Sequence, residues 1–239
     1  MKRQPWRVAV LIPARDEERL LPRCLKSVLA ASSALPASVH TDVIVVADSS
    51  VDRTSQIGAE ILKSRGTVLN ATVGTVGTAR RLAALYALSR NAGPLKLLWL
   101  ANTDADCIVP RTWIADQLEL AERRIEAIAG TVSVDSFEEH GPEVAERFRT
   151  SYIIGKDGSH SHVHGANLGV RADAYLRAGG WADLRTAEDH DLWGRLALMG
   201  ARTVSIARIE VVTSGRRVGR APHGFADALA AHNEVKAVA

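Results

Sequence analysis

Two acidic residues, Asp104 and Asp106, follow directly after the apolar run 95–100. Residues i and i+2 of an extended segment point the same way, so both carboxylates can face one point in space. A hard divalent cation removes their mutual repulsion and also takes oxygens from a phosphate substrate when few carboxylates hold it. The spacing predicts a metal and diphosphate site at the carboxyl end of a strand, where open α/β sheets bind ligands. A polar loop with a turn-forming Asp is the simpler alternative.

Other polar residues follow the two earliest apolar runs of the chain. Pro13, Arg15 and Glu17 come after the first run, and Asp48 ends the second. Asp48 has no evident structural role at the end of a strand, and we expect it to accept a hydrogen bond from a base or a ribose. Asp16 is instead typical of a helix N-cap.

Gly74 and Gly77 precede a helical pattern that carries Arg80 in its first turn. The spacing Gly-x-x-Gly-x-x-Arg resembles a phosphate-binding loop only loosely, and it is neither a Walker loop nor a dinucleotide fingerprint. A turn alone is the alternative role of the two glycines, and the sequence leaves both interpretations open. Arg80 would still be within reach of a diphosphate.

The elements that must position these residues alternate along the chain. Continuous apolar runs predict strands at 6–12, 43–47, 67–71, 95–100 and 127–134, with further strand segments at 164–170 and within 203–213. Helical spacing predicts helices at 17–31, 54–64, 78–90, 113–125, 143–152 and 188–199. Continuous strands followed by helices indicate an α/β fold, with a Rossmann-like, mostly parallel sheet covered on both faces and a less regular C-terminal half.

Composition restricts the class of protein. We expect the 239 residues to form a single domain, and no apolar run reaches the roughly 18 residues that a membrane span needs. Only two cysteines, Cys24 and Cys107, are present, which favours a reducing cytoplasm. The net charge is +3, and a short basic cluster near the C-terminus permits peripheral contact with an anionic membrane. Nucleic acid is not expected, because no aromatic residues are interleaved with that cluster.

The order of these motifs resembles a known family. The segments 13–18, 43–54, 74–80 and 104–106 resemble the nucleotide-binding half of a family 2 glycosyltransferase with the GT-A fold. Further on, 165–171 and Gly179-Gly180-Trp181 look like its acceptor-side segment, and Glu188-Asp189 looks like its catalytic-base motif. The resemblance runs from about residue 8 to residue 213. It divides the single domain into a nucleotide-binding half at about 6–110, an acceptor and catalytic half at about 111–213, and a flexible basic segment at 214–239.

The resemblance implies a UDP-, GDP- or dTDP-sugar donor, Mg²⁺ or Mn²⁺ as cofactor, and an acceptor that the sequence does not identify. The residues it implies for the donor are Asp48 at the base, Pro13, Arg15 and Glu17 around the nucleoside, Gly77 in the loop before the helix, Asp104 near the ribose or metal, and Asp106 on the metal. Arg80, Arg216 and Arg217 would stabilise the departing diphosphate. The second strand ends Ala-Asp-Ser-Ser where many members have two acids in a row, so the preferred base stays open.

The same resemblance implies that Asp189 is the general base. It would take the proton from the acceptor hydroxyl as that oxygen attacks the anomeric carbon with inversion, and Glu188 would orient or tune it. The alternative is structural, because Thr186 to Asp189 fits a capping-box-like helix start whose acids suit the helix dipole. Asp191 is the next candidate base.

Four histidines carry weaker hypotheses. His160, His162 and His164 alternate, so on a strand they would share one face, where they form a zinc-like site, line the acceptor loop or simply lie exposed. In some enzymes with the GT-A fold a late histidine completes the metal site, so the resemblance makes His223 a candidate metal ligand. An ordinary solvated basic tail is the alternative for that region.

Three functions compete at this point. The first is an inverting, metal-dependent glycosyltransferase, and the absence of Gln-x-x-Arg-Trp and of membrane helices favours a single transfer over processive synthesis. The second is a catalytically silent protein that binds nucleotide-sugars and scaffolds partners. The third is a sugar-phosphate nucleotidyltransferase, which the segment 13–18 disfavours because a Gly-rich loop with Arg and Lys is expected there.

Overall fold

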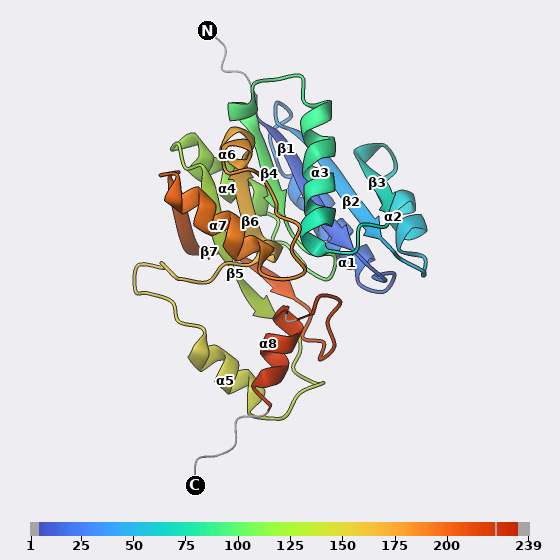
Figure 1. Ribbon diagram of the computed structural model, residues 1–239, viewed down its shortest axis with the longest axis vertical. Helices are drawn as coiled ribbons and strands as arrows, with labels where there is room; N and C mark the ends of the chain where they lie inside the picture. The colour runs from blue at the N-terminus through green and yellow to red at the C-terminus, as the bar shows by residue number, and fades with distance from the viewer. Residues whose placement is uncertain (1–4, 223, 234–239) are drawn as a thin grey trace.

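The computed structural model describes residues 5–222 and 224–233, and a seven-stranded sheet runs through it (Figure 1). The strands are β1 (Arg7–Ala14), β2 (His40–Asp48), β3 (Gly66–Ala71), β4 (Leu98–Asn102), β5 (Ala127–Val134), β6 (Leu168–Arg171) and β7 (Thr203–Thr213). Their order across the sheet is β3-β2-β1-β4-β6-β5-β7. Strand β6 is antiparallel to β4 and β5, and the other neighbouring pairs are parallel. The prediction of an α/β fold with a mostly parallel sheet is confirmed.

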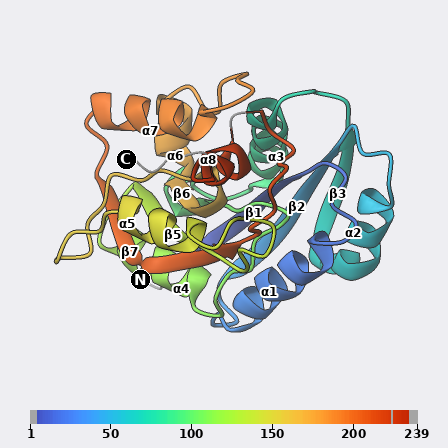
Figure 2. The same ribbon diagram turned by 90° about the horizontal axis from the view of Figure 1, so that it is seen from below.

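Helices cover both faces of the sheet (Figure 2). One face carries α1 (Leu21–Ser33), α2 (Thr54–Leu62) and α4 (Trp113–Glu122), and the other carries α3 (Val76–Arg90), α6 (Ala172–Arg177) and α7 (Glu188–Leu198). Alternate residues of β1 serve the two layers: Val10 packs with α1, and Leu11 packs with α3. Because side chains alternate along a strand, a continuous apolar run is what a strand buried on both faces requires.

Two further helices lie beyond one end of the sheet. They are α5 (Val144–Ser151) and α8 (Phe225–Ala231), which sit side by side in the lower part of the molecule (Figure 1). Their contact is aromatic, since the rings of Phe148 and Phe225 meet edge to face with centroids 5.9 Å apart. Short single-turn 3₁₀ segments at Lys63–Arg65, Leu95–Leu97 and Gly165–Asn167 complete the elements.

The start of α1 differs from the sequence prediction. Asp16 does not cap that helix: its backbone is left-handed, with φ of 52°, and its Oδ1 accepts a hydrogen bond from the Val51 amide at 2.8 Å. The helix begins only at Leu21, followed by Pro22, which suits a first turn because proline lacks the amide hydrogen that would be unpaired there. Residues 15–18 are thus free to form a loop that contacts the loop after β2.

The second half contains the larger departures. The strand predicted at 164–170 begins only at Leu168, because residues 165–167 form a 3₁₀ turn. The segment 95–97, predicted as strand, is also a 3₁₀ turn. Helices α6 and α8 were not predicted, and 203–213 is a single strand whose register with β5 shifts between Ala129 and Thr131.

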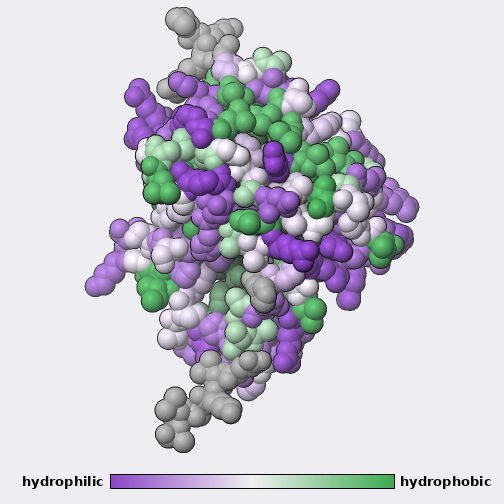
Figure 3. All heavy atoms as spheres, in the orientation of Figure 1, coloured by the Kyte–Doolittle hydropathy of each residue, from purple (hydrophilic) through white to green (hydrophobic). Residues whose placement is uncertain are grey.

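The fold brings three strand ends together. Parallel pairing of β2, β1 and β4 places the residues that follow each strand at one edge of the sheet. Figure 3 shows a mostly polar face, hollowed between the body that holds the sheet and the lower part that holds α5 and α8. None of the helices in the described part of the chain combines the length and apolar character needed to cross a lipid bilayer.

Candidate functional site

A cavity of about 500 Å³ opens at the carboxyl ends of β1, β2 and β4. Seven of the residues predicted from the sequence line it: Pro13, Arg15, Glu17, Asp48, Asp104, Asp106 and Arg216. The first turn of α3, the segment 213–222 and the start of α8 contribute the remaining walls. Residues more than 200 positions apart in the sequence therefore enclose one polar space of the size of a ligand site.

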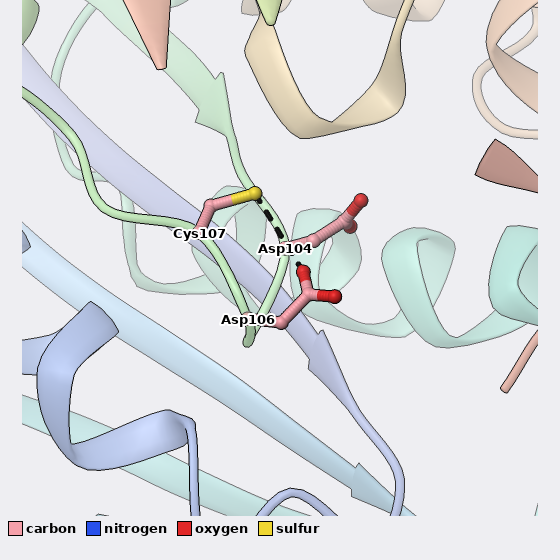
Figure 4. Close-up of side chains that lie close together, drawn as sticks. All are labelled: Asp104, Asp106 and Cys107. Carbon is pink, nitrogen blue, oxygen red and sulfur yellow. Dashed lines mark hydrogen bonds between the residues drawn. The ribbon is translucent and has the colours of Figure 1, made fainter. Parts of the chain in front are cut away.

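Asp104 and Asp106 lie in the loop after β4, and their carboxylates project to the same side of it (Figure 4). Their oxygens and the sulfur of Cys107 lie within 4.8 Å of one another, the one such grouping among residues 5–222 and 224–233. Burial raises the pKa of the Cys107 thiol well above its usual range, so it is protonated and donates toward Asp106 Oδ1 at 3.7 Å. The carboxylates are hard oxygen donors of the kind that Mg²⁺ and Mn²⁺ bind, and the thiol is not.

Arg216 ties the C-terminal segment to this loop. Its Nη2 lies 3.0 Å from Asp106 Oδ2, and its Nη1 donates to Glu17 Oε1 at 2.6 Å. Burial raises the pKa of both Asp106 and Glu17, and the Arg216 charge opposes that shift. Arg220 lies next to them, with its Nη2 donating to the Asp16 carbonyl at 2.9 Å. The basic cluster thus faces the acidic loops directly.

Asp48 ends β2 at the cavity wall, and the local backbone already uses its carboxylate. Oδ1 accepts from the Val73 amide at 2.8 Å, and Oδ2 accepts from the Gly74 amide at 3.1 Å. Gly74 has φ of +79°, which favours glycine. Asp48 therefore fixes the turn that leads into α3, and it has a structural role that the sequence did not reveal.

Arg80 lies behind the cavity wall and does not line it. Its side chain is 2% exposed, and it donates from Nη2 to Asp104 Oδ1 at 2.6 Å and from Nε to Glu188 Oε1 at 3.2 Å. The guanidinium also lies 5.4 Å from the ring centroid of Trp181. Burial disfavours the Arg80 charge, but Asp104, Glu188 and Asp189 outweigh it and raise the Arg80 pKa. Arg80 thereby holds the Glu188 carboxylate. No hydrogen bond from Glu188 to Asp189 is present among the described residues, so Glu188 does not orient Asp189 by direct contact.

Asp189 is the second residue of α7 and does not line the cavity either. Its Oδ2 accepts from the Gly165 amide at 2.7 Å, and its Oδ1 accepts from the His190 amide at 2.7 Å. The residue before the helix is Ala187, in a left-handed conformation with φ of 58° and no side-chain cap. Acidic residues still occupy the first turn, where the helix dipole favours them.

Gly77 is buried in a contact that needs glycine. A Cβ there would lie 2.2 Å from the Ala182 carbonyl oxygen, and its amide donates to the Leu184 carbonyl at 3.3 Å. This contact joins α3 to the loop before α7, and Asp183 strengthens it by accepting from Thr75 and Thr78 at 2.7 Å each. Gly77 is thus a packing residue in this structure, and it does not line the cavity.

The three alternating histidines do not converge on a point. His162 stacks on Tyr152 with ring centroids 3.8 Å apart, and His164 shares a 2.9 Å hydrogen bond with the Tyr152 hydroxyl. Residues 160–164 are not a strand, and they form none of the groupings with metal-ligand spacing in the described part of the chain. Burial lowers the pKa of His164 to about 4, so its ring is neutral near pH 7. The zinc-like interpretation is wrong.

The remaining predicted residues have separate outcomes. Arg217 is exposed and outside the cavity lining, and its backbone amide donates to Glu139 Oε2 at 2.8 Å. His223 lies outside the described residues, although Pro222 and Gly224 line the cavity. The structure adds Arg185, Arg220 and Phe225 to the lining, which were not predicted as site residues. The spacing of Phe225, Ala226 and Leu229 was the available signal for α8, and a lone Arg185 offered none.

Comparisons with known proteins come from sequence and from structure. The profile described as glycosyl transferase family 2 matches residues 9–177. No curated protein matches the chain by sequence. The fold is similar to that of Staphylococcus aureus TarS residues 1–349 in complex with UDP-GlcNAc, with 15% identity and a TM-score of 0.66 over 89% of this chain and 60% of that one. It is also similar to the mannosyltransferase PcManGT from Pyrobaculum calidifontis in complex with GDP-Man and Mn²⁺, with 19% identity and a TM-score of 0.67 over 96% and 69%.

These likenesses differ in what they establish. At identities below 20%, the structural matches establish the GT-A fold alone. The chain spans about 60% of the length of TarS residues 1–349. The sequence profile covers more than half of the chain and includes the loops after β1, β2 and β4 that form the cavity.

Proposed function

This chain belongs to glycosyl transferase family 2, and we propose that it transfers a sugar from a nucleoside-diphosphate sugar to an acceptor hydroxyl. One observation carries the proposal: the cavity gathers the carboxylates of Glu17, Asp48, Asp104 and Asp106 with the guanidinium groups of Arg15, Arg185, Arg216 and Arg220. Paired carboxylates suit a metal, and the arginines suit a diphosphate. TarS and PcManGT have this fold and were solved with UDP-GlcNAc and with GDP-Man and Mn²⁺, which supports a donor of that class.

Asp104 and Asp106 would hold Mg²⁺ or Mn²⁺, because their oxygens are close together, face the cavity and are hard donors. The ion would supply positive charge against the negative charge that develops on the leaving diphosphate. Arg216 and Arg220 would bind the same diphosphate from the C-terminal segment. Arg15, Pro13 and Asp48 would contact the nucleoside at the ends of β1 and β2.

Asp189 would act as the general base, with inversion at the anomeric carbon. Two backbone amides hold its carboxylate in a fixed position, and a remaining oxygen lone pair would take the proton of the acceptor hydroxyl. It lies outside the lining of the donor cavity, on the α7 side of Arg80, and the acceptor hydroxyl would attack the anomeric carbon on the face opposite the leaving diphosphate. A single displacement from the opposite side inverts the configuration.

We further propose that the chain works as one unit, with residues 6–110 holding most of the donor, 111–213 carrying the base and the acceptor surface, and the described residues 214–222 and 224–226 closing the donor cavity. This division is supported by residues 213–222 and 224–226, which supply a third wall of the cavity. We place the protein in the cytoplasm, where Cys24 and Cys107 stay reduced, and both are free thiols in the structure.

The experiment that tests this function is a thermal-shift panel of UDP-, GDP- and dTDP-sugars and their diphosphates, with Mn²⁺ and with EDTA. We expect one nucleotide class to raise the melting temperature only with metal, because a ligand that binds the native state stabilises it. The Asp106→Ala variant should lose that shift, whereas Glu60→Ala, exposed on α2 and outside the cavity lining, should keep it. No shift with any nucleotide in the folded wild type would refute the donor site. Consumption of the nucleotide-sugar when acceptors are added separates a transferase from a silent binding protein.

A further inference from the structure

The buried guanidinium of Arg80 occupies the boundary between the donor cavity and the first turn of α7. It is the one arginine among the largest fully buried side chains of the described residues. Its two partners come from distant parts of the chain, Asp104 from the loop after β4 and Glu188 from the start of α7. Such a cation remains buried only when its charge is paired on several sides.

The packing around Arg80 extends the contact to Asp189. A Cβ at Gly165 would lie 2.4 Å from Arg80 Nη2, so the Gly165 backbone lies directly against the guanidinium. The amide of the same Gly165 donates to Asp189 Oδ2 at 2.7 Å. On another side, the ring of Trp181 faces the guanidinium at 5.4 Å. A continuous set of contacts thus runs from Asp104 through Arg80 to both acidic residues that open α7.

These contacts do not fit a diphosphate-binding arginine. Such a residue needs donors that face the ligand, but Arg80 is absent from the cavity lining, its Nη2 and Nε donate to carboxylates, and its unpaired Nη1 is buried. Arg216 and Arg220 face the cavity and are better placed for that role. The burial and the two partners of Arg80 instead suit a residue that fixes distances between other groups.

We propose that Arg80 is a positioning residue that holds Asp189, through Glu188 and Gly165, at a fixed place relative to Asp104. The inference rests on the proposed function, in which Asp104 lies at the donor and Asp189 takes the acceptor proton. Proton transfer and attack need the reacting atoms in close register, and a misplacement of about 1 Å costs on the order of 100-fold in rate. Arg80 itself touches neither substrate.

The test separates positioning from diphosphate binding. Arg80→Lys keeps a positive charge, but one ammonium group cannot reproduce the guanidinium contacts to Asp104, Glu188 and Gly165 together. We expect its kcat to fall by about 10–100-fold while KM for the donor stays within about 3-fold of wild type. The affinity for Mn²⁺ with the nucleoside diphosphate, measured by calorimetry, should be unchanged. Arg81→Gln is the matched control, because Arg81 is the next residue of α3 and is exposed.

The substrate for these rates is whichever UDP-, GDP- or dTDP-sugar the wild type converts to nucleoside diphosphate, with water or an added sugar as acceptor. A tenfold loss of diphosphate affinity in Arg80→Lys would overturn the positioning role and make Arg80 a ligand of the donor. An unchanged kcat would overturn it as well. If Arg80→Lys does not fold, Glu188→Gln provides the second variant, since it loosens the Arg80 contact from the other side and should give the same kcat loss at constant KM. A wild type that turns over none of the donors refutes the proposed function itself, and the inference with it.

Discussion

Arg216 allows a prediction in which one substitution changes two affinities in opposite directions. Its guanidinium contacts Asp106 and Glu17, so it neutralises the carboxylate that we assign to the metal. A divalent cation that binds Asp106 must share or displace this charge. Arg216→Gln should therefore bind Mn²⁺ alone more tightly than the wild type and bind Mn²⁺ with nucleoside diphosphate less tightly.

The magnitude follows from the geometry of the pair. Two unit charges about 4 Å apart interact by about 4 kcal/mol at an effective dielectric constant of about 20. The side chains of Arg216 and Asp106 are 20% and 12% exposed, so water screens part of this energy, and a displaced guanidinium regains hydration. We take about half of this interaction energy, or about 2 kcal/mol, as the net effect. It corresponds to roughly 30-fold tighter Mn²⁺ binding in Arg216→Gln.

The substitution should lower the affinity, and not raise it, when the nucleoside diphosphate binds together with Mn²⁺. Arg216 then leaves Asp106 to the metal and donates to phosphate oxygens, and a hydrogen bond to a charged group contributes about 1.5–3 kcal/mol. Its loss should weaken the ternary complex by about 10–100-fold. Free Mn²⁺ measured by electron paramagnetic resonance gives the first affinity, and calorimetry at saturating Mn²⁺ gives the second.

Arg217→Gln is the control, because Arg217 is the neighbouring exposed arginine and does not line the cavity. Neither affinity should change in that variant. Equal or weaker binding of Mn²⁺ alone by Arg216→Gln, in a protein whose melting curve shows it to be folded, would refute the competition. Arg216→Lys keeps the charge and should resemble the wild type in Mn²⁺ binding.

Two further predictions concern the α7 side of the molecule. Asp189→Asn should keep the melting temperature and donor affinity of the wild type and lose transfer by about 10²–10⁴-fold, as measured by release of nucleoside diphosphate. Near-normal transfer would move the base to another residue, with Asp191 next. Burial lowers the pKa of His164 from 6.5 to about 4, with Asp189 opposing and nearby histidines assisting the shift. Since the unfolded chain binds that proton first, the free energy of unfolding should fall by up to about 3 kcal/mol as pH drops from about 6.5 to about 4, and urea titrations should show a shallower pH dependence in His164→Gln.

The first half of the fold was predictable because each element depends on local pattern. The continuous apolar runs before Asp48 and Asp104 indicated strands buried on both faces, and parallel connectivity then fixed which loops meet, although 95–97 is a 3₁₀ turn. For that reason the polar residues predicted at these strand ends line one cavity, and their roles stay predictions. The predicted helix boundaries were wrong where the backbone conformation departs from what the apolar spacing indicates. At Asp16 the backbone is left-handed, and α1 therefore begins later than predicted.

The contacts between distant residues were not predictable. No pattern shows that Arg80 points behind the cavity wall, because its partner Glu188 is 108 residues away. Gly77 looked like part of a phosphate loop, and only the approach of Ala182 shows that it is a packing residue. Arg185 enters the cavity on a loop that α3 holds in place, which sequence spacing does not encode.

The ring of Trp181 beside Arg80 has an optical consequence. An indole emits at a wavelength that depends on the electric field of nearby charges, and Trp181 is 1% exposed with a guanidinium 5.4 Å from its centroid. Trp99 and Trp113 are equally buried, but they donate to the neutral amides of Gln117 and Asn167. Trp181 is therefore the intrinsic fluorophore of this site. A change in charge at Asp104 alters the electric field at Trp181 through Arg80, so ligand binding in the cavity can be followed by the emission wavelength of the unlabelled protein.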